Sequence, residues 1–151
     1  MKTLQAWLQD YSDNHKNTVN QRFHFVCVPI IVFSVIAALK SIPVGNTWFN
    51  SATIVIILAL IYYFVLSWRL ALGLLVILIG FYASVLCLES FVAGNLIWYA
   101  LGIFIAGWFG QFIGHAIEGT RPSFFKDIQF LLIGPLWELM HFYRWLGLSV
   151  Y

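Results

Sequence analysis

Residues 48–88 read WFNSATIVIILALIYYFVLSWRLALGLLVILIGFYASVLCL, and Arg69 is the one charged residue among them. A membrane-spanning helix needs about 20 mostly apolar residues, so this stretch is long enough for two of them. The triplet Ser67-Trp68-Arg69 interrupts the stretch near its middle. We therefore expect two helices, about Trp48–Leu66 and Leu70–Leu88, joined by a very short turn as a tight hairpin.

The composition of the whole chain agrees with a membrane environment. Of the 151 residues, 62% are hydrophobic and 9% are charged, whereas a soluble domain has about 25% charged residues. Apolar surface that charges cannot cover must face lipid. The net charge of +2 is small and the basic residues form no stripe, which argues against a nucleic-acid partner.

Two elements are expected before this hairpin. A short amphipathic helix over Thr3–Asp13 is predicted to lie in the membrane interface, because one helical face collects Leu4, Trp7, Leu8 and Tyr11. A first span then runs from Thr18 to about Lys40, with Thr18 and Gln21 as a capping box and a kink at Pro29.

Two apolar segments follow the hairpin. In about Leu96–Gly114, the glycines Gly110 and Gly114 form a small-xxx-small pair that lets another helix approach closely. The last segment, Ile128–Leu148, is broken at Gly134-Pro135 and is either a fifth span or a re-entrant hairpin.

The expected fold class is therefore all-α. We predict one integral membrane domain over residues 1–151, a polytopic helix bundle with four to five apolar segments plus the N-terminal interfacial helix. Its orientation follows from the basic residues, because cytoplasmic loops are enriched in Lys and Arg. With the N-terminus inside, Lys40 lies outside and Arg144 is ambiguous, and the cytoplasmic side holds Lys2, Lys16, Arg22, Arg69, Arg121 and Lys126.

This orientation brings two polar segments, around residues 15–24 and 115–126, to one membrane face. His15 and His24 lie nine residues apart and would point to opposite sides of one continuous helix, so both can face one site only if the chain breaks between them. His115 ends the fourth apolar run. Polar groups at membrane depth are costly and tend to be functional.

Other polar residues lie one helical turn from these histidines. Asn20 precedes His24, Gln111 precedes His115, and Glu118 follows His115 on the same face. Glu138 and His141 have the Glu-x-x-His spacing found in di-iron bundles. Histidines near carboxylates suit iron, zinc or copper. The residues alone leave two interpretations open, a metal site or the helix caps and interface groups of a non-enzymatic lipid-binding or scaffold protein.

Two motifs favour the first interpretation. Residues 11–24 follow the pattern Y-x3-H-x-N-x2-N-x3-H, and residues 108–122 read WFGQFIGHAIEGTRP. Together with the order of the apolar runs, these motifs resemble the 2-hydroxy fatty acid dioxygenase family over nearly the whole chain. Members of the family often have Glu where His141 stands, an exchange of one ligand type for another that a metal position tolerates.

The resemblance implies an iron(II)-dependent enzyme that shortens a 2-hydroxy fatty acid by one carbon with O2. It implies Fe(II) ligands at His15, His24, His115 and His141. Asn20, Gln111 and Glu118 would orient the rings, and Arg121 would hold the substrate carboxylate. The acyl chain would enter from membrane lipid. We expect a bacterial inner membrane, or the endoplasmic reticulum in a eukaryote, with the site facing the cytoplasm.

Overall fold

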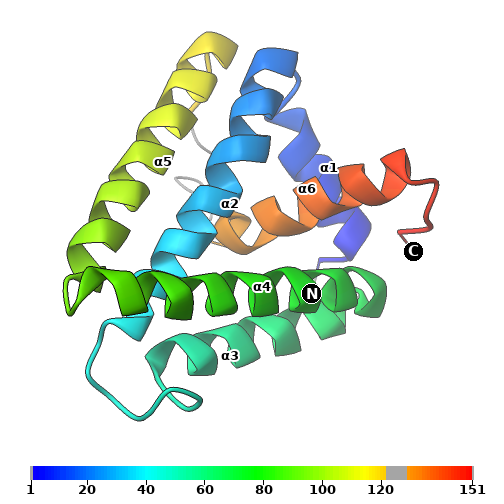
Figure 1. Ribbon diagram of the computed structural model, residues 1–151. Coiled ribbons are helices and arrows are strands. Elements are labelled where there is room, and N and C mark those ends of the chain that lie inside the picture. Colours follow the sequence, from blue (N-terminus) through cyan, green and yellow to red (C-terminus); the bar gives the residue numbers. More distant parts are fainter. Residues whose placement is uncertain (1, 122–128, 151) are drawn as a thin grey trace.

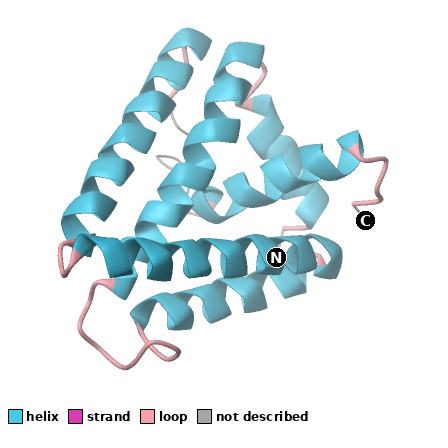
Figure 2. Ribbon diagram, viewed as in Figure 1, coloured by secondary structure: helices cyan, strands magenta, loops and turns pink. Residues whose placement is uncertain are grey.

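The computed structural model describes residues 2–121 and 129–150. Within these residues the regular structure is helical, apart from one isolated bridge between Gly45 and Asn50 (Figure 2). Six helices follow one another in the described part of the chain (Figure 1): α1 (Leu4–Asp13), α2 (Thr18–Lys40), α3 (Ser51–Leu66), α4 (Trp68–Val92), α5 (Leu96–Glu118) and α6 (Phe130–Trp145). The predicted all-α class is confirmed.

Three helices in the described part of the chain, α2, α4 and α5, are long and apolar enough to span a membrane. Helix α3 is apolar but has only 16 residues. Large apolar side chains on the long helices are exposed, among them Val26 at 61%, Val76 at 71% and Ile105 at 66%. These surfaces indicate membrane association, although the predicted count of four to five spans is not confirmed.

Helices α2 and α5 pack closely along a stripe of glycines on α5. A Cβ at Gly110 would lie 2.4 Å from Sγ of Cys27, and a Cβ at Gly114 would lie 2.4 Å from Oδ1 of Asn20. Only glycine lets the two backbones approach this far. The predicted small-xxx-small contact therefore exists, and its partner is the first long helix.

Helices α3 and α4 form the predicted hairpin, and Ser67 alone joins them. Ser67 is the C-cap of α3 and the N-cap of α4, where its hydroxyl accepts a bond from the backbone N–H of Leu70. Figure 1 shows this pair crossing the end of the α2–α5 pair. Apolar residues of α2, α3, α4 and α5, including Ile36, Ala52 and Val85, form a core at this crossing.

Helix α1 differs from the prediction in its surroundings. Its apolar face is buried in protein, with Trp7 5% and Tyr11 4% exposed, and packs against α6. The ring of Trp7 meets Phe130 edge-on at 5.4 Å between centroids. Another helix and not lipid therefore covers the apolar face of α1, and the position of α1 in the membrane interface stays a prediction.

Two local predictions also need correction. The last segment is one helix that continues through Pro135 and has no break at Gly134-Pro135; the predicted start at Ile128 lies outside the described residues. The N-cap of α2 is Asn17 and not Thr18, because the Asn17 side chain accepts bonds from the backbone N–H groups of Val19 and Asn20.

Candidate metal centre

Three histidines from separate segments meet at one buried point. His15 lies between α1 and α2, His24 lies in the second turn of α2, and His115 lies in the last turn of α5. Their exposed fractions are 1%, 3% and 2%. One nitrogen from each ring lies within 4.8 Å of the other two. The chain does break between His15 and His24, at residues 14–17, as the prediction required.

The outer nitrogen of each ring has a partner that orients it. Nδ1 of His15 lies 2.6 Å from the carbonyl oxygen of Tyr11, so it carries the hydrogen and donates it. Nδ1 of His24 lies 3.2 Å from the Tyr11 hydroxyl, and Nδ1 of His115 lies 3.3 Å from Oγ1 of Thr120. Metal-binding histidines are oriented in this way by a second group on the other nitrogen.

The inner nitrogens fit a metal ion. Nε2 of His24 and Nε2 of His115 are 3.1 Å apart, close to the spacing of two nitrogen ligands with bonds of about 2.0–2.1 Å to one ion. Nε2 of His15 is buried without a hydrogen-bond partner among the described residues. Burial lowers the pKa of His15, which favours the neutral form that can ligate. Three neutral imidazoles suit a divalent transition metal.

Glu118, at the end of α5, binds the segment that contains His15 through hydrogen bonds. Its Oε1 accepts bonds from the backbone N–H groups of Lys16 at 2.6 Å and Asn17 at 3.0 Å. Its Oε2 accepts a bond from Nδ2 of Asn20 at 2.5 Å. Asn20 is fully buried and lies against Gly114. The carboxylate also stabilises the start of α2, where backbone N–H groups are free.

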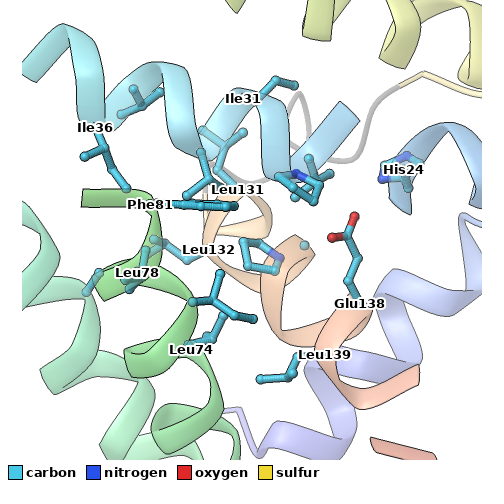
Figure 3. A pocket seen from close by; sticks show the side chains of 18 of the residues that line it. His24, Ile31, Ile36, Leu74, Leu78, Phe81, Leu131, Leu132, Glu138 and Leu139 are labelled. Carbon is cyan, nitrogen blue, oxygen red and sulfur yellow. The ribbon is translucent and has the colours of Figure 1, made fainter. Parts of the chain in front are cut away.

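A cavity of about 980 Å³ opens beside the three histidines. Figure 3 shows His24 and Glu138 at one end of it and Ile36 and Leu78 at the other. Apolar side chains of α2, α3, α4 and α6 form most of its wall. A cavity of this size is at the upper end of the range for small-molecule sites, about 300–1,000 Å³.

The remaining predicted site residues lie at different distances from the cluster. Gln111 is 3% exposed and lines the cavity, as does His141. His141 is not part of the group of three: its Nδ1 bonds the carbonyl oxygen of Trp137 at 2.9 Å, and its ring packs against that of Trp137. Arg121 is exposed and does not line the cavity.

The prediction missed two side chains around the cluster. Tyr11 touches two of the histidines, since its ring also stacks on His15 with 4.1 Å between centroids. Its spacing of four residues from His15 was the available signal, because i and i+4 share a helical face. Thr120 carried no such signal, since it lies beyond the end of α5.

Comparison with known proteins identifies a family whose model matches the chain. The family model described as 2-hydroxy-palmitic acid dioxygenase Mpo1-like matches residues 1–145. The 2-hydroxy-palmitic acid dioxygenase MPO1 of Saccharomyces cerevisiae (strain ATCC 204508 / S288c) is 27% identical over 147 residues, which cover 95% of this chain and 82% of the yeast protein. No solved structure matches the chain.

Proposed function

Because the chain belongs to the Mpo1-like family of 2-hydroxy-palmitic acid dioxygenases, we propose that it is an iron(II)-dependent dioxygenase for the alpha-oxidation of 2-hydroxy fatty acids. Family membership itself places the chain in 2-hydroxy fatty acid metabolism. The proposed reaction is R–CH(OH)–COOH + O2 → R–COOH + CO2 + H2O. It balances without an external reductant, and its product is the fatty acid shortened by one carbon.

The proposed ligands are His15, His24 and His115, through their inner nitrogens. Three neutral imidazoles leave the ion with its positive charge and with positions that O2 and a 2-hydroxy carboxylate can occupy. When bound, iron(II) would supply the redox chemistry that lets O2 react with the acid. The sequence-based assignment of His141 as a fourth ligand stays a prediction, and so does that of Arg121 as the group that holds the carboxylate.

The observation that carries the proposal is the position of the three histidines at one end of an apolar cavity. A fatty acid has one polar end and a long apolar chain. The cavity offers ring nitrogens at one end and side chains such as Leu78 and Phe81 along the wall (Figure 3). The chain would fill the apolar part while the polar end lies at the histidines.

The residues around the rings would hold them in place. Tyr11 and Thr120 would fix the outer nitrogens, and Glu118 with Asn20 would keep the segment of His15 against α5. These are positioning roles, because none of the four supplies an atom to the group of three inner nitrogens.

The proposed location of the site is the cytoplasmic side of a bacterial inner membrane, or of the endoplasmic reticulum in a eukaryote. Lys16 and Arg121 flank the site end of the α2–α5 pair. At the other end Lys40 is paired with Glu89, with 2.9 Å between Nζ and Oε1. This distribution supports the orientation with more basic charge inside. Lys126 lies outside the described residues.

Anaerobic purification followed by metal quantification and an oxygen-dependent assay tests the proposal. Wild-type protein is expected to hold iron and to consume 2-hydroxypalmitate with release of the acid that is one carbon shorter. His24→Ala and His115→Ala are expected to lose the metal and to lower activity at least about 100-fold, because each removes a ligand. His141→Ala decides the size of the ligand set: retained iron means three protein histidines, and lost iron means four.

The competing function is that of a non-enzymatic lipid-binding or scaffold protein. It predicts no bound metal and no consumption of 2-hydroxypalmitate. Full activity after His24→Ala or His115→Ala, with the protein folded, would also remove the proposed enzyme. The size-exclusion profile of each variant in detergent serves as the control for folding.

A further inference from the structure

Besides Nε2 of His15, an amide and a carboxyl side chain in the cavity wall each have a buried atom without a hydrogen-bond partner among the described residues. These atoms are Nε2 of Gln111 on α5 and Oε1 of Glu138 on α6. Buried polar groups nearly always have a partner, because leaving one unpaired is costly. Two such atoms facing one cavity therefore point to a ligand that would complete both sets of hydrogen bonds.

The surroundings of Glu138 are apolar. Its neighbours on α6, Trp137 and Leu139, are buried, and its carboxyl points into the cavity beside His24 (Figure 3). Burial raises the pKa of Glu138 to about 9, and in either protonation state the carboxyl offers an acceptor oxygen. It is the one carboxyl among the described residues that line the cavity.

Glu138 is also separate from the group of three inner nitrogens. The set of ligand atoms within 4.8 Å of one another contains His15, His24 and His115, and no oxygen of Glu138. By contrast, Glu118 uses both oxygens in hydrogen bonds to the protein. Glu138 therefore has a free oxygen where a molecule in the cavity would lie next to the histidines.

The two unpaired atoms match the polar end of a 2-hydroxy acid. A hydroxyl both donates and accepts, so it can pair with a carboxyl in either protonation state. The amide nitrogen of Gln111 only donates, and a carboxylate only accepts. A 2-hydroxy acid has a hydroxyl and a carboxylate on adjacent carbons, followed by an apolar chain.

We propose that Glu138 and Gln111 bind the polar end of the substrate, Glu138 at the 2-hydroxyl and Gln111 at the carboxylate. The inference rests on the proposed function and deepens it, because it names the residue that distinguishes a 2-hydroxy acid from a plain fatty acid. Loss of Glu138 then weakens binding of the hydroxylated acid alone, whereas loss of Gln111 weakens binding of both acids.

Binding of 2-hydroxypalmitate and of palmitate to the iron-loaded protein in detergent, without O2, tests this assignment. Glu138→Leu is expected to lower the affinity for 2-hydroxypalmitate about tenfold, the effect of one lost hydrogen bond, and to leave that for palmitate unchanged. Glu138→Gln should keep the preference within about threefold, because an amide can also pair with a hydroxyl. Gln111→Leu should lower the affinities for both acids to the same extent.

Glu89→Leu is the matched control, because it removes a carboxyl that does not line the cavity. Its preference for 2-hydroxypalmitate over palmitate should equal that of wild type. Iron content is measured in every variant. An unchanged preference in Glu138→Leu, or loss of iron from it, overturns the assignment. Leucine suits this apolar wall, and Glu138→Met provides the same comparison if Glu138→Leu does not fold.

The outcomes also separate this inference from the proposed function. If wild type consumes 2-hydroxypalmitate and Glu138→Leu retains the full preference, the role of Glu138 is wrong and the enzyme assignment stands. If wild type binds the hydroxylated acid in preference but does not consume it, and Glu138→Leu loses that preference, the enzyme assignment is wrong and the role of Glu138 stands.

Discussion

Glu118 and Glu138 are two carboxyl groups near the same cluster with opposite surroundings. The oxygens of Glu118 accept bonds from two backbone N–H groups and from the amide of Asn20. Oε1 of Glu138 is buried without a partner among the described residues. The first arrangement stabilises the folded chain, whereas the second makes the folded chain less stable than it could be.

The carboxyl of Glu138 should therefore make stability depend on pH. Burial raises its pKa to about 9, so between pH 4.5 and 9 the folded state keeps a proton that the unfolded state has lost. Rising pH then lowers the free energy of unfolding, by up to about 1.4 kcal/mol per pH unit. Glu138→Gln removes this dependence, so in metal-free protein its Tm should exceed that of wild type by several degrees more at pH 8 than at pH 5.

Thermal unfolding in detergent measures this difference, and Glu89→Gln is the matched loss of a carboxyl. A constant difference in Tm between Glu138→Gln and wild type across the pH range would show that the carboxyl is not buried as described.

Single residues of the site were predicted unequally well. The histidines at 15, 24 and 115 could be found because imidazoles are rare in apolar chains and because polar residues, including 14–17, surround them in the sequence. The free oxygen of Glu138 could not be found, because its lack of a partner depends on which side chains of other helices surround it. From the sequence, Glu138 was noted only for its Glu-x-x-His spacing with His141.

Helices α2 and α5 owe their close approach to the glycines on α5, and the same approach brings His24 to His115. The contact at Gly114 is the tightest beside the site, since an added Cβ would also lie 2.9 Å from Cβ of Phe23. Gly114→Ala should therefore lower the free energy of unfolding by about 1–3 kcal/mol, the usual cost of overpacking. It should also weaken the bond between Asn20 and Glu118.

Gly102→Ala is the matched control, because it makes the same change on α5 where an added Cβ meets nothing within 4 Å. Its expected effect is a gain of up to about 1 kcal/mol from helix propensity. Thermal unfolding in detergent checks both variants, and equal Tm values for them would contradict the packing described for α2 and α5.

At the scale of elements, apolar runs predicted the bounds of the helices well. They predicted less well whether lipid or another helix covers each apolar face. The first span was expected at Thr18–Lys40 and has those bounds. The face of α1 was correctly identified, but amphipathicity is the same whether lipid or a neighbouring helix covers it. Pro135 was expected to break the last segment, and α6 continues through it.

In the whole molecule, the cluster joins the α1–α2 connection, α2 and α5. A bound ion would stabilise the folded state by about 2.7 kcal/mol at a hundred times its Kd, which corresponds to a Tm difference of about 5–10 °C for a chain of this size. A chelator should therefore lower the Tm of iron-loaded wild type and leave that of His115→Ala unchanged. An equal Tm with and without chelator, in protein shown to hold iron, would place the ion elsewhere.

The basic residues predicted an orientation that brings residues 15–24 and 115–126 to one face, and in the structure His15, His24 and His115 meet. The sequence did not predict the cavity, whose wall combines side chains from α2, α3, α4, α5 and α6. Figure 1 shows the α3–α4 pair crossing the α2–α5 pair. Crossing geometry depends on contacts between helices, and periodicity within one helix carries no information about it.

The distance in sequence between His24 and His115, 91 residues, has a consequence for biosynthesis. At about 5–20 residues per second, a ribosome needs roughly 5–18 s to make the intervening chain. During that time the nascent protein has two of the three imidazoles and lacks the third. Assembly of the cluster must therefore wait until α5 has been inserted, which makes the centre one of the last parts of the protein to mature.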